Sequence, residues 1–529
     1  MFLPLQFRWQ RSVACLFVAY SSFSIAEESI QPVEQAVQCF PISKLSIEGA
    51  SLLPKSTRNE LAANIENSCV NLDDINTTLS MVSNWYQSKG YVTTRAYLPQ
   101  QYLSSGELTL SVIEGVIESI SATADTDVQI FNSFPLLTNK TLNLRDIEQG
   151  IDQLNRLSSN QTWMELSPGL KPGGSQINIY NDRSKAWSAS LRVDNSGSEA
   201  TGLYQARLAA STDNLLKTNE YLSISYQSDL EQNRSGKLSE SGSLHADIPF
   251  GYWLLALDIN ANQYNNRING ENQTFETSGD GNSETVAVSN VVYRSQARKT
   301  EILSSLTRKE SRNFIEDVLL DTSSRTTAVG KLTLRHQEIL PGSQTVNIQV
   351  DLSKGLDLFG SPQKSQIDNS PEPLFTAYLA NITYNKSFQW LTVNHSLQSS
   401  FNMQLSEDIL FGSEQFSIGG LYSVRGYKGE SVAGRKGAYL RNDLTSYFTI
   451  PQNVIKLSSI STTVGWDIGG LWDSPTSLGN EEVLQGISVG FRLSGKYLSA
   501  ETTMTRALSR PEHFGNDLNQ FHFAVTAKL

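Results

Sequence analysis

One arginine stands in an apolar, glycine-rich stretch of the sequence, in the motif Val424-Arg425-Gly426-Tyr427. A guanidinium among apolar neighbours needs a partner, because an unpaired buried charge is strongly destabilising. Asp467, which is flanked by glycines two positions away on either side, is the best candidate for that partner. We therefore predict an ion pair between Arg425 and Asp467, and the elements that carry the two residues decide where it can form.

No group of residues has the spacing of a catalytic or metal site. The five histidines are not spaced as metal-ligand pairs, and no cysteine cluster accompanies them. There is no Walker-type phosphate loop and no nucleophile elbow in a strand-to-helix setting. The net charge of −11 argues against a nucleic-acid partner. We predict a protein that is not an enzyme and that binds no metal, cofactor or nucleic acid.

The first residues have the pattern of a secretion signal. Arg8 and Arg11 give a positive start, and the stretch that follows is mostly apolar or small up to Ala26. A transmembrane helix is disfavoured, because the apolar run is short and interrupted by serines. We predict a signal peptide over residues 1–26 and a short N-terminal segment over residues 27–38.

Two cysteines, Cys39 and Cys69, remain in the exported chain. In an oxidising compartment an even pair most simply forms one disulfide. Two buried free thiols are the alternative.

Two small α+β units are predicted next, over residues 39–115 and 116–183. Each has the order strand, helix, helix, strand, strand, and each has the size of a minimal domain. The expected elements of the first unit are 42–47, 54–66, 73–89, 93–98 and 107–113, and those of the second are 117–122, 128–134, 144–157, 162–166 and 175–180.

The remainder of the chain, residues 184–529, has the pattern of an outer-membrane β-barrel. Segments of roughly ten residues alternate apolar with polar, for example 346–352, 487–493 and 521–529. A wall between lipid and an aqueous lumen has this alternation. A soluble β-sandwich also alternates, but it does not need Asp, Arg and Lys on its enclosed face.

About 16 strands can be counted, and the lengths of their connections alternate. Short joins at 249–251, 340–342, 451–453 and 495–496 follow even-numbered strands. Long joins at 265–282, 354–373, 404–435 and 470–482 follow odd-numbered strands. Short periplasmic turns and long external loops are expected of 16 antiparallel strands in an outer-membrane barrel.

The loop over residues 404–435 contains the arginine motif, and its region holds seven glycines from Gly412 to Gly437. Such a backbone can fold tightly inside a confined space. We therefore expect this loop to start on the external side and to insert into the lumen.

Strand alternation gives the direction of the predicted partner. On the thirteenth strand the lipid-facing set is 464, 466 and 468, so Gly465, Asp467 and Gly469 point into the lumen. The two glycines leave room for an incoming side chain, and Arg425 is expected to reach Asp467 there. Arg441, Asp443 and Arg492 are expected to line the channel.

Motifs in a consistent order and spacing resemble the two-partner secretion transporters (the TpsB proteins of the haemolysin-activator type), a branch of the outer-membrane assembly-factor superfamily. The resemblance covers nearly the whole mature chain. It is carried by the segments 39–42, 90–96, 98–101, 144–150, 154–157, 168–173, 193–198, 418–420 and 424–427.

The resemblance implies two periplasmic POTRA domains before a 16-stranded barrel in the outer membrane of a Gram-negative bacterium. It implies transport, without nucleotide, of one unfolded secreted exoprotein of the TpsA type, a filamentous β-helix. The other implied partners are outer-membrane lipid and lipopolysaccharide, and the transporter is expected to be monomeric. Arg425 and Asp467 correspond to the loop-to-wall pair of the superfamily.

Some predictions concern how the client is bound. A sheet edge of a POTRA domain can accept an extended client segment as an added strand. Candidate client contacts are Tyr91 and Arg95 in the first unit and Arg145 and Asp146 in the second, with structural roles as the alternative. On the second helix of that unit, Asp146, Glu148 and Arg156 are expected to form an exposed face.

Two other functions compete with secretion. An assembly or insertion factor for outer-membrane proteins has related domains, and a passive porin would not need the POTRA units. The client class is open between haemolysin, adhesin, contact-dependent toxin and haem scavenger. A plug helix through the pore is not expected, because a membrane-spanning helix needs about 20 residues and only about a dozen separate Ala26 from Cys39.

Overall fold

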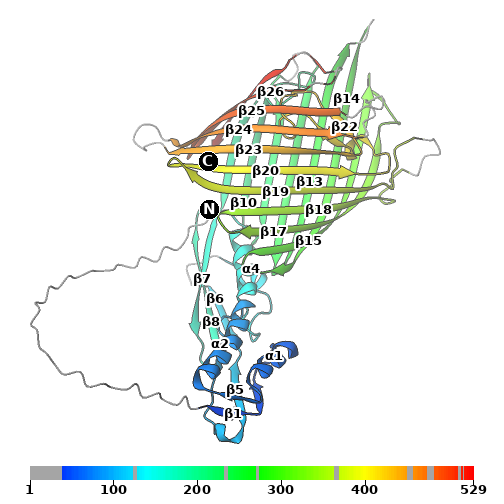
Figure 1. Cartoon of the computed structure of the whole chain (residues 1–529). Coiled ribbons are helices and arrows are strands. Elements are labelled where there is room, and N and C mark those ends of the chain that lie inside the picture. Colours follow the sequence, from blue (N-terminus) through cyan, green and yellow to red (C-terminus); the bar gives the residue numbers. More distant parts are fainter. Residues whose placement is uncertain are drawn as a thin grey trace, which may run out of the picture.

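Two small domains extend from one end of a closed β-barrel in the computed structural model (Figure 1). The structure describes residues 39–122, 128–231, 236–269, 273–362, 369–449, 457–472, 482–509, 511, 514–515 and 517–529. The predicted signal peptide, the segment 27–38 and the region considered for a plug helix lie outside these residues. Among the described residues, no helix is both long enough and apolar enough to cross a membrane.

The first domain packs two helices on a three-stranded sheet in the order β2-β5-β4, with β1 and β3 paired beside it. In this sheet β2 is parallel to β5 and β4 is antiparallel to it. The short strand β3 was not predicted. The elements are β1 (Phe40–Ile42), β2 (Lys44–Glu48), α1 (Lys55–Ile65), β3 (Ser68–Val70), α2 (Leu72–Ser88), β4 (Arg95–Tyr97), the 3-10 turn η1 (Leu103–Ser105) and β5 (Glu107–Ile113).

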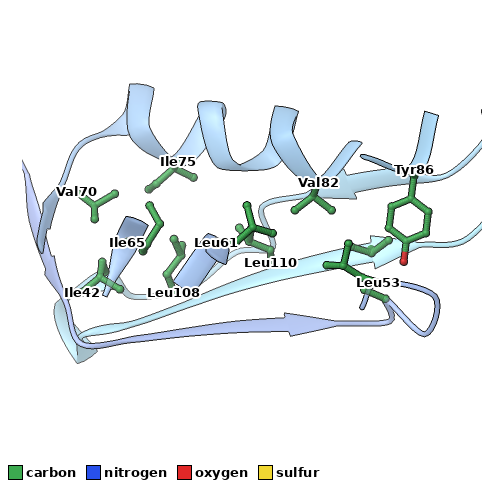
Figure 2. Packing of buried hydrophobic residues seen from close by; sticks show 12 residues of the cluster. Ile42, Leu53, Leu61, Ile65, Val70, Ile75, Val82, Tyr86, Leu108 and Leu110 are labelled. Atoms are coloured by element: carbon green, nitrogen blue, oxygen red, sulfur yellow. The ribbon is translucent and has the colours of Figure 1, made fainter. Parts of the chain in front are cut away.

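Helix α2 begins and ends at residues suited to those positions. Asn71 and Asp74 form a reciprocal capping box at its start, and Gly90, with φ +94°, follows its end. The buried face of α2 packs on α1 and on the sheet, as Figure 2 shows. Tyr86 closes this core and donates a hydrogen bond of 2.7 Å to Glu114. Burial, followed by this contact with Glu114, raises the pKa of Tyr86.

A disulfide joins Cys39, directly before β1, to Cys69 in β3. Replacing both cysteines by serine is expected to destabilise the first domain by about 3–4 kcal/mol, because the bond closes a loop with a sequence separation of 30. The rate at which a protease cleaves the N-terminal domains of the full chain measures this effect. A reducing agent should accelerate cleavage of the parent and not of the double variant. Equal rates for the two proteins without the reducing agent would contradict the expectation.

The second domain repeats the packing of helices on a three-stranded sheet, here in the order β6-β8-β7. The backbone N–H of Leu144 donates to the carbonyl of Gly90, which ties the start of its longer helix to the first domain. The elements are β6 (Val116–Ala122), α3 (Ile130–Ser133), α4 (Leu144–Asn155), β7 (Asn160–Pro168) and β8 (Gly174–Arg183).

The barrel contains 16 long antiparallel strands and the two-residue β16 in the described part of the chain, and β27 closes on β9. The predicted all-β barrel of 16 antiparallel strands is confirmed. The strands are β9 (Trp187–Asp194), β10 (Gln205–Asp213), β11 (Tyr221–Asp229), β12 (Leu238–Phe250), β13 (Trp253–Asn269), β14 (Thr274–Arg294), β15 (Arg298–Ile315), β16 (Val318–Leu319), β17 (Arg325–Leu340), β18 (Gln344–Leu356), β19 (Thr376–Trp390), β20 (Val393–Leu405), β23 (Gly437–Thr449), β24 (Leu457–Leu471), β25 (Glu482–Gly495), β26 (Leu498–Ala507) and β27 (Asn519–Lys528).

The connection predicted as a long loop over 265–282 is wrong. Strands β13 and β14 remain paired out to Asn269 and Thr274, so most of this stretch is a projecting hairpin. Its side chains are largely polar, and the apolar alternation that reveals a bilayer-facing strand is therefore lost while the backbone ladder continues. The turn predicted at 451–453 lies outside the described residues, as do parts of the joins at 354–373 and 470–482.

Side chains of β24 alternate between the two faces of the wall. Val464 and Trp466 are 58% and 42% exposed on the outer face, whereas Asp467 is fully buried. The outer surface is thus apolar, and the carboxylate is carried on the inner face of the barrel.

Candidate functional site

The connection between β20 and β23 folds back against the inner wall. It contains the 3-10 turn η2 (Gly412–Glu414), and its arms β21 (Phe416–Ile418) and β22 (Val432–Gly434) pair as a small hairpin. Apolar residues of this lumenal loop form a core with residues of β24, β25 and β26: Ile418, Val424, Tyr427, Val432, Leu471, Leu484 and Ala507. Burial of these side chains stabilises the loop against the wall.

Arg425, at the tip of the lumenal loop, makes a bidentate ion pair with Asp467 on β24. Its Nε donates to Oδ2 and its Nη2 to Oδ1, each over 2.6 Å. The backbone N–H of Arg425 donates to the same Oδ2 over 3.0 Å. Arg425 is 3% exposed and Asp467 0%, so both charges are withdrawn from water. Planar, two-point pairing of this kind fixes orientation as well as position.

A second carboxylate, which the sequence did not assign to this site, completes the surroundings of the guanidinium. Nη1 of Arg425 donates to Asp443 Oδ1 over 2.5 Å, and Arg441 Nε donates to the other oxygen of Asp443 over 3.0 Å. Nη1 of Arg441 also donates to the carbonyl of Leu421 in the lumenal loop. Two cations thus face two anions, which limits the electrostatic cost of burying them.

The signal for this wider site was present in strand alternation. Arg441 and Asp443 share one face of β23, and the register places Arg441 opposite Asp467. They were predicted only as channel lining, because sequence alone does not show which lumenal charges the loop reaches.

Glycines on the wall allow the loop backbone to approach closely. A Cβ at Gly465 would lie 2.2 Å from Arg425 Nη2, and one at Gly486 would lie 1.8 Å from the carbonyl oxygen of Arg425. At Gly469 the nearest loop atom would be Val424 Cγ2, at 2.9 Å. Gly465 and Gly469 were predicted to leave this room, whereas Gly486 was not identified.

The remaining two motif residues bind the loop tip to β25, to β26 and to the residues that follow β26. Gly426 has φ +105° and lies against the backbone of Ala507. The hydroxyl of Tyr427 donates to the carbonyl of Gln485 over 2.8 Å and also contacts the carbonyl of Ser509. Each residue of the Val424–Tyr427 motif is therefore in contact with the barrel wall.

The candidate client contacts in the first domain have different environments. Tyr91 is half-buried and packs edge-on against Tyr86. Arg95 is exposed on the edge strand β4, and its Nη1 donates to the carbonyls of Val92 and Thr94.

Both candidates in the second domain lie on α4, close to the barrel. Arg145 pairs with Glu148 on the same helix over 2.6 Å. Asp146 accepts a hydrogen bond of 2.6 Å from Tyr252, in the turn between β12 and β13. Burial, followed by this bond to Asp146, raises the pKa of Tyr252. Asp146 thus joins the second domain to the barrel.

The expectation that α4 presents an exposed charged face is wrong. Arg156 forms an ion pair with Asp247 on β12 and donates to the carbonyl of Asn219 over 2.6 Å. Arg294 on β14 pairs with Asp152 over 2.6 Å, and a second contact of 3.6 Å joins Arg294 to Glu148. A helix with charges on one side has the same pattern whether that side faces water or charges of another domain.

Replacing Arg156 by alanine is expected to loosen the second domain on the barrel by roughly 1.5–3 kcal/mol. The substitution removes a charge-assisted hydrogen bond to the nearly buried carboxylate of Asp247 and another to the carbonyl of Asn219. Hydrogen exchange of the α4 amides measures this change. Arg145→Ala is the matched control, because its ion pair stays within α4. Equal exchange rates in the two variants would show that the Asp247 contact does not hold the domain.

Comparisons with known proteins agree with this architecture. The family model for haemolysin secretion/activation protein ShlB/FhaC/HecB matches residues 173–493. Models of a ShlB-type POTRA domain and of a POTRA domain match residues 40–115 and 115–168. The two predicted POTRA domains are thereby confirmed.

Curated relatives are similar along most of the chain. "Outer membrane transporter CdiB" of Dickeya dadantii (strain 3937) is 30% identical over 480 residues, covering 89% of this chain and 84% of the relative. "Hemolysin transporter protein ShlB" of Serratia marcescens is 29% identical over 449 residues, covering 84% and 78%.

Solved structures show the same fold. CdiB from Escherichia coli superimposes with a TM-score of 0.87 at 26% identity, covering 96% of this chain and 93% of that one. CdiB from Acinetobacter baumannii gives 0.79 at 21% identity, covering 96% and 91%. With its barrel, two POTRA domains and loop-to-wall site, the chain belongs to the ShlB/FhaC/HecB family of haemolysin secretion/activation proteins.

Proposed function

We propose that this protein is an outer-membrane transporter that takes up one unfolded partner exoprotein in the periplasm and secretes it through its barrel without nucleotide. The observation that carries this proposal is the combination of two POTRA domains with a barrel whose lumen holds a loop anchored by a buried ion pair. The family and its relatives, which are transporters, support it. The protein acts in transport rather than in catalysis.

The POTRA domains provide the first contact with the client. The sheet of the first domain ends in β2 and β4, and that of the second ends in β6 and β7. An extended client segment can pair with such an edge through its main chain. Arg95, which is exposed on β4, is the predicted contact residue best placed for this step. Asp146 instead supports the position of the domain below the pore.

The Arg425–Asp467 pair holds the tip of the lumenal loop against β24. On the adjacent strand β23, Asp443 accepts a hydrogen bond from the guanidinium of Arg425, and Arg441 donates to the loop carbonyl of Leu421. A loop held at the wall by its tip leaves the rest of the lumen as the path of the client. We assign the pair a positioning role in secretion, with no chemical step.

The surroundings of the barrel follow from its outer surface. Exposed apolar residues such as Leu255, Val464 and Phe491 suit the hydrocarbon of lipid and of lipopolysaccharide. We propose that a single copy forms the pore, since one chain closes the barrel by itself. Light scattering of the detergent-solubilised protein, corrected for bound detergent, tests this: a mass of two or more chains would contradict it.

Secretion of a partner exoprotein can be tested directly. A candidate exoprotein is sought in the reading frames next to the gene for this chain. It is produced with and without this chain, and its amount outside the cell is measured. Secretion that depends on the chain supports the proposal. Unchanged secretion, accompanied by loss of other outer-membrane barrels, would favour an assembly factor instead.

Exchanging the charges of the pair (Arg425→Asp with Asp467→Arg) is expected to recover part of the secretion lost in either single variant, because the attraction is restored. Recovery should be incomplete, since an aspartate at 425 faces Asp443, and adding Asp443→Asn should improve it. Secreted exoprotein is quantified for each variant at equal barrel abundance. Absence of any recovery would mean that the two residues have separate roles.

A further inference from the structure

A pocket of about 380 Å³ lies where the second POTRA domain meets the outer wall of the barrel. Its volume falls within the ~300–1,000 Å³ of typical ligand sites. Its lining comes from α3, from the turn between β10 and β11, and from β12, β13 and β14. The residues that matter for the argument are Phe131, Lys217, Ile248, Phe250, Trp253 and Leu255.

The barrel side of this pocket belongs to the bilayer-facing surface. Along β12, Ile248 and Phe250 are 41% and 46% exposed, whereas Asp247, on the opposite face of the strand, is buried against Arg156. Along β13, Trp253 and Leu255 continue the outward apolar row. The pocket therefore opens on the outside of the wall, away from the lumenal loop and the path of the client.

The depth of the pocket is marked by aromatic side chains. Exposed aromatic residues stand at the ends of the strands that lie on the POTRA side, as in the aromatic girdle that marks a membrane–water interface. They are Trp187, Phe250, Trp253, Trp390, Tyr447 and Tyr497. The pocket is thus level with the headgroups and first acyl carbons of the periplasmic leaflet.

Helix α3 is turned so that an aromatic side chain meets this surface. Phe131 is 78% exposed, and its ring centroid lies 6.2 Å from that of Phe250. The polar side of α3 is buried: Asn219 Nδ2 donates to Asn132 Oδ1 over 2.7 Å and to Ser133 Oγ over 3.0 Å. These buried hydrogen bonds set the orientation of α3. Phe131 is therefore exposed beside the outer wall, at the depth of the bilayer surface.

The turn between β10 and β11 adds a cation next to apolar residues. Leu215 and Leu216 are 67% and 70% exposed, and Lys217 follows them on the rim of the pocket. An ammonium at the membrane surface attracts phosphate groups, while leucines beside it suit acyl chains. In water this combination of exposed apolar side chains would be unfavourable.

We propose that α3 and the β10–β11 turn form a binding site for one phospholipid of the periplasmic leaflet. An acyl chain lies against Phe131, Phe250 and Leu255, and the headgroup phosphate lies at Lys217. The site anchors the second POTRA domain to the membrane surface in addition to its ion pairs with the barrel. The inference rests on the outer-membrane location in the proposed function, and it does not depend on which client is secreted.

The test uses the full chain in vesicles, without client. A fluorophore is attached to Phe131→Cys, and nitroxide-labelled phospholipids serve as quenchers; Cys39 and Cys69 do not react because they are joined. Leu170→Cys is the matched control. Leu170 is 93% exposed at the tip of the β7–β8 hairpin in the same domain. This hairpin tip lies at the end of the second domain that contacts the first domain. Heat-modifiable migration in gels confirms that each labelled barrel is folded.

The expected result is strong quenching at position 131 by nitroxides near the headgroup, with little at position 170. Quenching at position 131 should be stronger when the nitroxide is on phosphatidylglycerol, which is anionic, than when it is on phosphatidylethanolamine. Lys217→Glu should reduce this difference. Equal, weak quenching at both positions would place α3 in water and overturn the proposal. The proposal would also be overturned if client segments in detergent changed the fluorescence of the label at position 131 while labelled lipid did not quench it. The pocket would then be a client site. Loss of secretion alone would bear on the proposed function and leave this measurement unaffected.

Discussion

Arg425→Ala is expected to reduce secretion of the partner exoprotein at least about tenfold while the barrel stays folded in the membrane. The substitution removes the four hydrogen bonds of the guanidinium. It also leaves the fully buried Asp467 and the neighbouring Asp443 without their shared cation. Breaking a buried ion pair in this way costs about 3–5 kcal/mol, which is enough to release the loop tip from the wall. The strand ladder does not include this contact, so barrel closure should persist.

Immunoblots of exoprotein outside the cell measure this effect, and heat-modifiable migration of the transporter reports the folded barrel. Arg207→Ala is the matched control: it removes a wall arginine on β10 that donates to Ser225, away from the loop tip. Arg425→Lys should lie between parent and alanine variant, since a lysine keeps the charge and loses the bidentate geometry. Normal secretion by Arg425→Ala would remove the basis for a loop-positioning mechanism.

Gly486→Ala is expected to impair secretion nearly as strongly, although it removes no polar group. The added Cβ would lie 1.8 Å from the carbonyl oxygen and 2.8 Å from the carbonyl carbon of Arg425. Both are backbone atoms, so no side-chain rotation relieves the overlap, and the loop tip must move away from β25. That movement separates Arg425 from Asp467 and lengthens short, directional hydrogen bonds.

Gly490→Ala provides the control on the same strand and the same face. A Cβ there would meet Thr503 Oγ1 at 3.4 Å, an ordinary contact. Secreted exoprotein is compared for the two variants at equal amounts of folded barrel. If both secrete equally well, close approach of the loop to β25 is not needed for transport.

Alternation along the strands predicted the barrel well because each bilayer-facing strand must be apolar on one face. The projecting β13–β14 hairpin was missed for the complementary reason: beyond the bilayer, no constraint makes its outer face apolar. Strand β3 was missed because three residues are too few for a periodic pattern. The helices were placed closely, since α2 has its capping residues and Gly90 at the expected positions.

Arg425 and Asp467 could be paired from sequence because a charge in an apolar loop needs a partner, and Asp467 lies on the lumenal face of its strand between two glycines. Asp443 and Gly486 could not be assigned in the same way. Their roles depend on the position along the strands at which the loop tip meets the wall. Strand alternation predicts which face of the barrel a residue lies on, but it does not predict that position. The charges of α4 were assigned to solvent for a similar reason, as their partners lie about 60–150 residues away in the chain.

The sequence by itself determined the class of this protein: two small α+β domains, a 16-stranded barrel and a charged loop motif. These features depend on local composition and periodicity, which are written along the chain. Only the tertiary structure decided which residues meet: Asp443 with Arg425, Asp247 with Arg156, and Phe131 with Phe250 on the outer wall. The physical reason is that burial and Coulomb attraction depend on distance in space, and closure of the barrel brings together residues that no sequence spacing relates.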